Sequence, residues 1–301
     1  MAFLPQEILF HHILPKLPVK SICRFKCISK SFMALFNDTL FIKTHLSQTH
    51  RDKLLAIPQS DLYLIDPKTS SNDEKLTAKR LDFSNDRVCF FGSCNGLCCL
   101  YVPQRRVYFF YNPSTKECSK EIPMPNLMSA DDRLDYYPEA AGFGYAPSID
   151  DYKMVILSYW EGLTHMFSLR NNLWKRIHQY EENLFGTGTP VNGALHWLTY
   201  SVENIRSIVS FDLVEEKFKS FPLPDYFQSG FNLLDSNENG RMIIMFEIWV
   251  MKVYGVVDSW TRILISKEHL QKPIYQSNYC HVKAFTESLV SPNWYIGVSY
   301  H

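Results

Sequence analysis

The sequence lacks a surplus of either charge. Among its 301 residues, 31 are lysine or arginine and 31 are aspartate or glutamate, so the formal net charge is zero. A protein that neutralises the phosphates of nucleic acid, or that binds an anionic membrane, normally carries a basic excess. We therefore expect neither nucleic acid nor a membrane as the main partner.

The sequence also lacks a long apolar run and an export leader. No apolar stretch approaches the roughly 18 residues that a membrane-spanning helix needs, and the richest one, 242–251, contains Glu247. The first residues have no basic region ahead of an apolar one, so we expect no secretory signal. The eight cysteines follow no regular framework, which suits reduced thiols. These features predict a cytoplasmic or nuclear protein.

The signatures of common enzyme classes are missing as well. The sequence contains no GxxxxGK[ST] or GxGxxG phosphate loop, no GxSxG elbow and no HExxH motif. Gly142-Phe143-Gly144 is too short for a phosphate loop and indicates a close approach at the start of a strand. Cys94, Cys98 and Cys99 lack the distant second pair that zinc sites use. We expect no catalysis, no cofactor and no metal.

The first 46 residues predict a small helical unit. Leu4-Pro5 and Leu17-Pro18 each place a proline where a helix can begin, and Ser29 suits the N-cap of a third helix. The expected helices span residues 5–14, 18–27 and 30–37. The first is apolar on nearly all sides, and so small a unit cannot cover it alone. Either the rest of the chain or a second protein must do so.

Three runs in this unit resemble the F-box motif. They are residues 4–9 (LPQEIL), 13–22 (ILPKLPVKSI) and 24–32 (RFKCISKSF). The resemblance implies docking onto the Skp adaptor of a Skp–cullin–F-box ubiquitin ligase, so that a partner covers the apolar helix. By position, it assigns the adaptor contact to Leu4, Pro5, Ile8, Leu9, Ile13, Leu14, Leu17, Pro18, Val19 and Ile22.

Three residues depart from the F-box pattern. His12 stands where the family usually has Glu, and Phe32 where it usually has Trp. Pro15 falls near the end of the first helix, where its missing N–H is expected to shorten the last turn. Of the three, Pro15 is the departure expected to weaken adaptor binding.

From about residue 53 the pattern changes to short apolar or alternating runs separated by turn signals. Asn-Gly, a strong hairpin signal, begins at Asn95, Asn192 and Asn239, with intervals of 97 (192 − 95) and 47 (239 − 192). Trp174 and Trp260 are 86 residues apart (260 − 174), which is two intervals of 43. A period of this size, with four short strands per unit, is typical of β-propeller blades. We expect about five such units, with two stacked antiparallel sheets as the alternative.

The repeat also assigns roles to single residues and loops. Because Trp174 and Trp260 recur with the period, we expect them to pack within blades rather than bind a ligand. His196, inside a predicted strand, is expected to be a hydrogen-bonded core residue. The charged stretches 66–80 and 129–139 are expected to be solvated loops rather than binding motifs. As long loops they are also the candidates for a target-binding face, since recognition is often carried by loops.

This half of the chain resembles the plant F-box-associated domain, a relative of kelch repeats. The resemblance rests on residues 92–97 (GSCNGL), 111–117 (YNPSTKE), 142–147 (GFGYAP), 191–198 (VNGALHWL), 208–213 (IVSFDL), 249–255 (WVMKVYG) and 287–292 (ESLVSP). It implies an α+β multidomain protein, with a helical F-box at 1–46 and an all-β, propeller-like domain at 53–301. The run 287–292 resembles the family's C-terminal strand.

One departure concerns the length of the β half. Family members usually carry about one further blade before the C-terminal strand, whereas here only residues 262–286 separate the two segments. We therefore expect either a ring with fewer blades or an internal deletion. A ring short of one blade would expose two sheet edges.

Together the resemblances imply the substrate-recognition subunit of a Skp–cullin–F-box ubiquitin ligase. It would perform no bond chemistry, and would tether a target protein near the transfer site. The alternatives are an F-box and propeller module acting outside a ligase, a kelch-like oxidase and a degenerate receptor that has lost a blade. The resemblance also admits an S-locus F-box-like role with a ribonuclease target, and no residue selects among targets.

Overall fold

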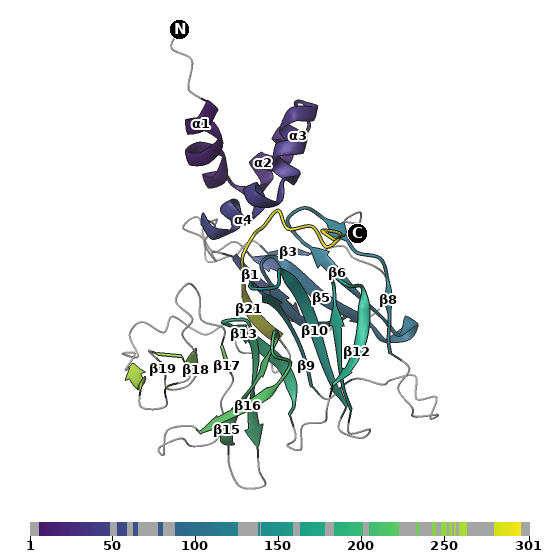
Figure 1. Ribbon diagram of the computed structural model, residues 1–301, viewed down its shortest axis with the longest axis vertical. Helices are drawn as coiled ribbons and strands as arrows, with labels where there is room; N and C mark the ends of the chain where they lie inside the picture. The colour runs from purple at the N-terminus through teal and green to yellow at the C-terminus, as the bar shows by residue number, and fades with distance from the viewer. Residues whose placement is uncertain are drawn as a thin grey trace.

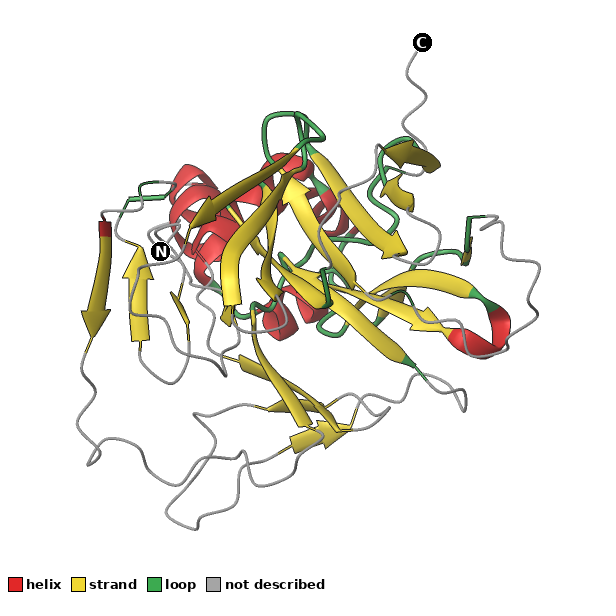
Figure 2. Cartoon of the chain, turned by 90° about the horizontal axis from the view of Figure 1, so that it is seen from below, coloured by secondary structure: helices red, strands yellow, loops and turns green. Residues whose placement is uncertain are grey.

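In the computed structural model, helices at the N-terminal end precede a large region of β-strands (Figure 1). The structure describes residues 6–48, 53–58, 63–65, 78–80, 88–125, 138, 140–158, 163–177, 184–200, 205–222, 233–234, 243–244, 248–251, 253–254, 256, 259–263 and 280–295. Seen from below in Figure 2, the strands lie in front of the N-terminal helices, so these helices cover one end of the β region. No helix in the described part of the chain combines the length and the apolar character needed to cross a membrane.

The N-terminal helices form what we call the helical module. Its elements are α1 (Gln6–Ile8), η1 (Leu9–Ile13), η2 (Leu14–Lys16), α2 (Val19–Phe25), α3 (Lys30–Asn37) and α4 (Thr39–Gln48). The first three are continuous, and the α-helix widens to a π-helical turn in η1 and tightens to a 3₁₀ turn in η2. Pro15 lies in that last turn, where it has no N–H to continue an α-helix. The shortening expected at Pro15 is therefore confirmed.

Side-chain caps define the start of the last two helices. The Ser29 hydroxyl accepts the Phe32 N–H at 3.1 Å, which confirms the predicted N-cap of α3. Asp38 is the corresponding N-cap of α4, and its carboxylate accepts the Phe41 N–H at 3.0 Å. The helix α4 was not among the expected elements, and its buried face, which includes Phe41 and Ile42, packs into the core of the module.

Of the strands in the described residues, twenty form five groups of four, and β8 is an additional strand that pairs with β6. In spatial order they are β21-β1-β2-β3, β4-β5-β6-β7, β12-β11-β10-β9, β13-β14-β15-β16 and β17-β18-β19-β20, here called blades A to E. The second strand of each blade pairs with antiparallel neighbours. Blades C and D join into one eight-stranded sheet, because their first strands, β9 and β13, pair in parallel. The propeller-like fold class is confirmed, and the expected number of about five units agrees with these groups.

The strand bounds show how short the elements are. Blade A holds β1 (Lys53–Pro58), β2 (Tyr63–Ile65), β3 (Ala78–Arg80) and β21 (Cys280–Phe285). Blade B holds β4 (Cys89–Cys94), β5 (Leu97–Val102), β6 (Val107–Asn112) and β7 (Glu117–Cys118), with η4 (Pro103–Arg105) between β5 and β6, and β8 (Ile122–Pro123) also pairing with β6. Blade C holds β9 (Ala140–Ala146), β10 (Asp151–Ser158), β11 (Leu163–Ser168) and β12 (Leu173–Ile177). Blade D holds β13 (Gly186–Val191), β14 (Ala194–Tyr200), β15 (Ile205–Asp212) and β16 (Phe218–Pro222). Blade E holds β17 (Leu233–Leu234), β18 (Ile243–Ile244), β19 (Ile248–Met251) and β20 (Trp260–Ile263).

Blade A joins the two ends of the β region. The strand β21 pairs antiparallel with β1 over six residue pairs, from Lys53 opposite Phe285 to Pro58 opposite Cys280. It occupies the place in blade A that β4, β9, β13 and β17 occupy in the other blades. The last strand of the chain therefore completes the first blade.

The predicted turns recur at equivalent places. Asn95-Gly96 has φ values of 50° and 78°, and Asn192-Gly193 has 50° and 74°, as two-residue type I′ hairpins require. Both join the first strand of a blade to the second, and Asp150, with φ of 51°, ends the corresponding turn of blade C. The signal at Asn239-Gly240 lies outside the described residues.

A second kind of turn joins the third strand of a blade to the fourth. Asn112 in blade B and Asp212 in blade D each accept, through Oδ1, the N–H two residues ahead at 2.8 Å, which makes an Asx turn. In blade C the hydroxyl of Ser168 accepts the Asn171 N–H in the same way at 3.1 Å. Because neighbouring strands alternate in direction, both kinds of turn lie at one end of each blade, which we call the turn end.

The run 287–292 is not the C-terminal strand that the family resemblance suggested. That strand is β21, and residues 286–291 follow it without strand pairing. Side chains of blade B bind the backbone carbonyls of this run, and Ser288, Leu289 and Val290 are buried. Figure 1 shows the run as the yellow coil between the helices and the strands.

Close packing between blades C and D depends on two glycines of β9. A Cβ added at Gly142 would lie 2.8 Å from a methyl of Leu195, and one at Gly144 would lie 2.9 Å from a methyl of Leu213. The close approach expected at Gly142-Phe143-Gly144 is confirmed. The glycines therefore let side chains of blade D lie directly on the backbone of β9.

Trp174 packs within the blades, as expected. Its indole lies 5.2 Å from the ring of Phe167 and 5.8 Å from that of Tyr108, and its N–H donates to the Pro123 carbonyl at 2.9 Å. The indole thus links blade C to blade B. Trp260 occupies the matching strand of blade E, and its side chain lies outside the described residues.

Candidate partner-binding surface on the helices

Only part of the predicted adaptor-contact set is available at the surface. Leu4 and Pro5 lie outside the described residues. Leu14, Val19 and Ile22 are 3%, 2% and 0% exposed and belong to the core of the helical module. These three hold the helices together and present no surface to a partner.

The other five predicted residues reach the surface to different extents. Ile8 and Ile13 are 43% and 38% exposed, and they lie five residues apart on the first helix. Pro18 is exposed, whereas Leu9 and Leu17 are half-buried against the hydrophobic cluster of the module. Ile8 and Ile13 are therefore the clearest members of an outward apolar surface.

Three further exposed apolar residues were missed by the sequence reasoning. Ile28 after α2, Met33 on α3 and Leu40 on α4 are 65%, 48% and 71% exposed. With Ile8 and Ile13 they form the exposed apolar set of the module. Five exposed apolar side chains on so small a unit make it a candidate interaction site. Met33 had a sequence signal, because it lies off the stripe that carries Phe32, Leu35 and Phe36.

A buried histidine holds this surface in shape. His45 of α4 is 1% exposed, and its Nε2–H donates to the Leu17 carbonyl at 2.8 Å. Burial lowers the pKa of His45, against the opposing effect of the carbonyl. A neutral imidazole therefore ties α4 to the bend between η2 and α2.

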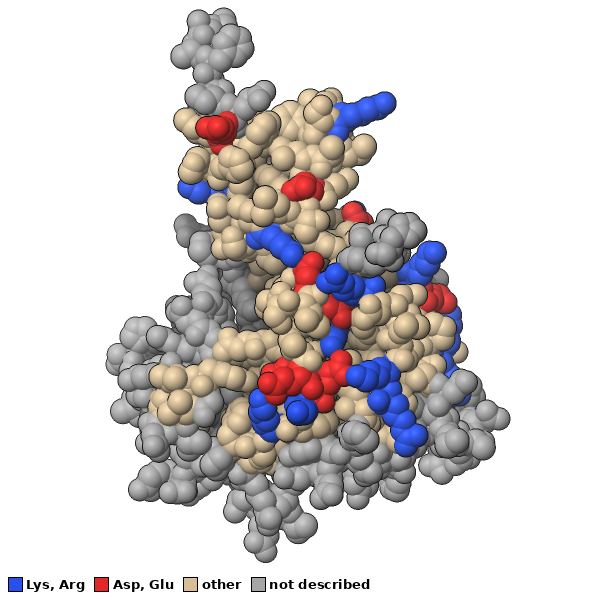
Figure 3. Space-filling view, viewed as in Figure 1, with Lys and Arg blue, Asp and Glu red and all other residues tan. Residues whose placement is uncertain are grey.

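The helical module is basic although the chain is neutral. Residues 1–48 contain six lysines and arginines and two acidic residues, which gives a net charge of +4 (6 − 2). The basic residues are Lys16, Lys20, Arg24, Lys26, Lys30 and Lys43. Figure 3 shows blue side chains spread among tan atoms over this part of the surface. The surface suits a partner whose own surface is apolar and acidic.

Cys98, Cys99 and His196 occupy core positions in the β region. Among the residues that the structure describes, no three His, Cys, Asp or Glu side chains gather closely enough to hold a metal ion. Cys98 and Cys99 are fully buried, and burial raises the pKa of both thiols. They pack as small apolar side chains.

His196 is the hydrogen-bonded core residue that its strand position predicted. It is 0% exposed, its Nδ1 binds the Thr189 carbonyl at 3.2 Å, and its Nε2 accepts the Tyr254 hydroxyl at 2.6 Å. Burial lowers the pKa of His196 to about 4, so the ring is neutral near pH 7. The pair joins blade D to the turn after β19.

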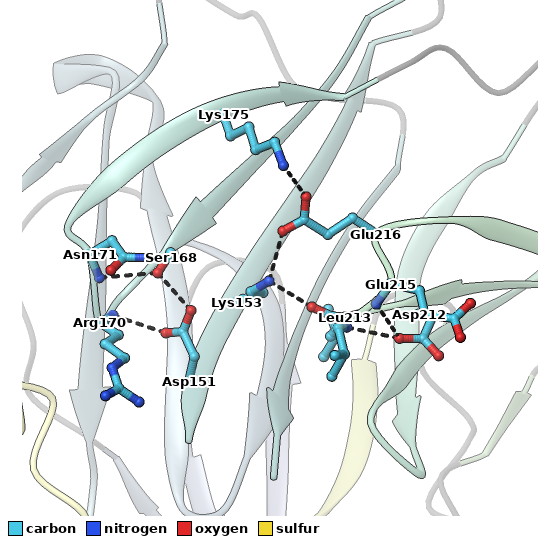
Figure 4. A network of polar contacts seen from close by, with 11 residues as sticks. Asp151, Lys153, Ser168, Arg170, Asn171, Lys175, Asp212, Leu213, Glu215 and Glu216 are labelled. Atoms are coloured by element: carbon cyan, nitrogen blue, oxygen red, sulfur yellow. Dashed lines mark hydrogen bonds and ion pairs between the residues drawn. The ribbon is translucent and has the colours of Figure 1, made fainter. Parts of the chain in front are cut away.

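A polar network at the turn end joins blades C and D (Figure 4). Lys153 of β10 is 4% exposed, and its ammonium donates to the Leu213 carbonyl at 2.6 Å and to Glu216 at 3.0 Å. Glu216 also pairs with Lys175. Partial burial acts to raise the pKa of Glu216, but the two ammonium groups outweigh it and hold that pKa below its usual range. Glu216 of blade D thus pairs with two ammonium groups of blade C across the blade boundary.

Asp151 anchors the same end of blade C. Its carboxylate accepts the Ser168 hydroxyl at 2.6 Å and the Arg170 N–H at 2.9 Å, and its side chain is 2% exposed. Burial raises the pKa of Asp151 despite those hydrogen bonds. The group closes a turn, so the networks in Figure 4 serve the fold.

Comparison with known proteins places both halves of the chain. Residues 54–289 match the family described as the F-box associated beta propeller domain. An F-box/kelch-repeat protein of Arabidopsis thaliana is 27% identical over 297 residues, which covers 87% of this chain and 79% of that protein. The F-box protein CPR1 of the same plant is 27% identical over 336 residues, covering 96% and 78%. The chain therefore belongs to the plant F-box proteins that carry an F-box associated β-propeller domain.

Proposed function

We propose that this protein is the substrate-recognition subunit of a Skp–cullin–F-box ubiquitin ligase. The helical module would hold a Skp-type adaptor, and through it cullin, while the propeller domain would hold a target protein. The observation that carries the proposal is the set of exposed apolar side chains on the basic helical module. Membership of the F-box family supports an adaptor as the partner of that surface.

The proposal gives the eight assigned residues that the structure describes two kinds of role. Ile8, Ile13 and Pro18 would contact the adaptor directly, with the half-buried Leu9 and Leu17 at the edge of the contact. The buried members would act as a scaffold that keeps the helices at fixed angles. Ile28, Met33 and Leu40 extend the candidate surface beyond the assigned set.

The chain itself would perform no bond chemistry. Its contribution is to keep target lysines near a charged ubiquitin-conjugating enzyme, which makes a bimolecular transfer nearly intramolecular. The buried ionisable side chains Asp151, Lys153 and His196 are each bound within the fold, which supports structural roles for them.

The domains and location follow the same proposal. Residues 1–46 would act as the F-box and 53–301 as the receptor, in the cytoplasm or nucleus, where thiols stay reduced. None of the cysteine side chains that the structure describes forms a disulfide, which supports such a compartment. The target is a protein whose identity the contacts do not select, and a ribonuclease target would require the S-locus-like role.

Co-expression with a plant Skp adaptor, followed by size-exclusion chromatography with light scattering, tests the proposal. The wild-type chain should elute as a one-to-one complex, and the double variant Ile8→Asp, Ile13→Asp should elute without adaptor. Leu173→Asp is the matched control, because Leu173 is a 67% exposed apolar residue on blade C. It should retain the adaptor.

Two results would count against the proposal. If the double variant still co-purifies with adaptor, the contact lies elsewhere. If the folded wild-type chain binds no adaptor, a propeller module acting outside any ligase becomes the better account. Circular dichroism of each variant establishes that a lost complex is not a lost fold.

A further inference from the structure

We propose that residues 286–295, here called the C-terminal clamp, fix the helical module against the turn end of blades B and C. The clamp begins directly after β21, which ends at Phe285. Figure 1 shows it passing between the helices and the strands. The inference rests on contacts within this chain, and its meaning for ubiquitin transfer rests on the proposed function.

The first half of the clamp is bound by blade B. Asn112 is 0% exposed, and its Nδ2 donates to the carbonyls of Ser288 at 3.0 Å and Val290 at 2.8 Å. The Ser288 hydroxyl donates to the Asn95 carbonyl at 2.6 Å. Asn112 uses its other atom, Oδ1, for the Asx turn of its own blade. One buried side chain thus holds both a turn and the clamp.

The fit at this point leaves no space for a side chain. A Cβ added at Gly96 would lie 2.3 Å from the Ser288 hydroxyl oxygen and 2.8 Å from the Thr286 carbonyl. The turn of blade B therefore meets the clamp in direct backbone contact. The Ser288–Asn95 hydrogen bond at this point joins residues that are 193 positions apart in the sequence.

The second half of the clamp meets blade C and the helix α4 at one residue. The Tyr295 hydroxyl donates to the Asp150 carbonyl. The Asp150 carboxylate binds Lys43 of α4 at 2.8 Å and accepts the Tyr145 hydroxyl. Partial burial acts to raise the pKa of Asp150, but Lys43 and Tyr145 outweigh it, so the carboxylate is charged near pH 7. Asp150 is the point where clamp, blade and helix are joined.

Apolar contacts continue the same connection. Leu289 and Val290 are buried in one continuous hydrophobic cluster with Ile22 and Phe36 of the helical module. Trp294 and Tyr295 pack against that cluster from the side. The clamp therefore contributes to the core that the helices and blades share. Asn293 adds a hydrogen bond from its side chain to the Cys118 carbonyl at 3.1 Å.

A fixed helical module has a consequence for the proposed ligase. The adaptor would be held on the helices and the target on the blades, so the clamp would set the distance and angle between them. Because effective concentration falls when two sites sample many relative positions, a rigid join favours transfer to particular target lysines. The clamp residues would be positioning residues.

Hydrogen exchange with mass spectrometry on the chain alone tests the clamp. The full chain and a chain ending at Tyr295 should protect α2 and α4 equally. A chain ending at Phe285 keeps β21 and loses the clamp. Its α2 and α4 amides should exchange about tenfold faster or more, while β10 and β14 keep their protection. Unchanged exchange in α4 would overturn the proposal.

Point variants test the clamp if the chain ending at Phe285 does not fold. Lys43→Met removes the ion pair to Asp150 and should speed exchange in α4 by about two- to fivefold, the effect of an ion pair near the surface. Lys43→Arg should restore protection. Lys219→Met, which breaks the exposed Lys219–Glu215 pair, is the matched control. Equal exchange in Lys43→Met and Lys219→Met would refute the join at Asp150.

The two proposals can fail separately. Both exchange experiments use the chain without adaptor, so they report on the clamp whether or not an adaptor binds. Conversely, the Ile8→Asp, Ile13→Asp test changes residues that touch neither Asp150 nor the clamp contacts named above. A folded chain with a firm clamp and no adaptor would leave this inference standing and remove only its role in a ligase.

Discussion

Short polar side chains at the turn end carry much of the specificity of this fold. Asn112, Ser168 and Asp212 hold the same place in three successive blades and cap the turn between third and fourth strands. Two of these side chains form a further hydrogen bond: Asn112 also binds the clamp, and Ser168 also binds Asp151. Single side chains therefore couple a local turn to a second segment.

Gly96→Ala should destabilise the protein more than Gly186→Ala. Both glycines have positive φ, 78° and 76°, which costs about 1–2 kcal/mol for alanine. A Cβ at Gly186 meets nothing within 4 Å, whereas one at Gly96 forces Ser288 aside. Loss of the Ser288–Asn95 hydrogen bond should add about 1 kcal/mol or more.

Urea denaturation of the two alanine variants measures that difference. The chain ending at Phe285 provides a second control, because without Ser288 the two alanines should cost the same. Equal free energies of unfolding for Gly96→Ala and Gly186→Ala in the full chain would contradict the tight fit at Ser288.

Glu216 should make stability depend on pH in the acid range. Its pKa is lowered from the ordinary 4.5, so its charged form stabilises the fold above that pH, and the benefit is lost as pH falls through the lowered value. Glu216→Gln lacks this contribution. Its melting temperature should lie below that of wild type at pH 7, and the gap should shrink below pH 4.5.

Two comparisons keep this pH test specific. The raised pKa of Asp151 acts in the opposite direction, but wild type and Glu216→Gln share it, so it cancels in the difference. Glu215→Gln changes an exposed pair with Lys219 and should follow wild type closely. If the difference in melting temperature between wild type and Glu216→Gln stays constant down to acid pH, the network does not stabilise the fold through charge.

At the scale of helices and strands, local signals were sufficient where an element is stabilised locally. The N-cap at Ser29, the hairpins at Asn95 and Asn192 and the shortened turn at Pro15 follow from the residues themselves. The helix α4 was missed because TLFIKTHLSQ contains β-branched residues and no clear apolar stripe. Burial of Phe41, Ile42 and His45 among the other helices makes it helical, and no window of sequence contains that information.

Ser29→Ala should weaken the helical module without altering the blades. Loss of an N-cap costs about 1 kcal/mol. Ser31→Ala is the matched control, since Ser31 is an exposed residue inside the same helix. Urea unfolding followed by helical circular dichroism should place Ser29→Ala below both wild type and Ser31→Ala. An equal effect of the two substitutions would mean that the Ser29–Phe32 hydrogen bond adds little.

The candidate surface shows what a motif can and cannot predict. The F-box resemblance assigned ten residues to one contact, but it does not separate residues at the surface from residues that face their own core. That separation depends on tertiary packing, since Ile22 shares a buried hydrophobic cluster with Phe41 of α4 and Leu289 of the clamp. The contact of Asn112 with Ser288, 176 residues away, has no counterpart in local periodicity.

At the scale of the whole molecule, the strand β21 decides whether blade A is complete. Removing residues 280–301 takes away six residue pairs with β1 and leaves an unpaired strand edge. We expect such a chain to associate or precipitate, whereas a chain ending at Phe285 should remain monomeric by light scattering. A soluble monomer with unchanged melting temperature after removal of β21 would show that blade A does not need its C-terminal strand.

The pairing of β1 with β21 also has a consequence for synthesis on the ribosome. The strand β1 leaves the ribosome early, but its partner begins 222 residues after β1 ends (280 − 58). At about 5–20 residues per second, that interval is roughly 10–45 seconds. Blades B, C and D, each built from consecutive strands, can form during this time, while blade A remains incomplete. A message that stops early therefore yields a protein in which β1 has an open sheet edge.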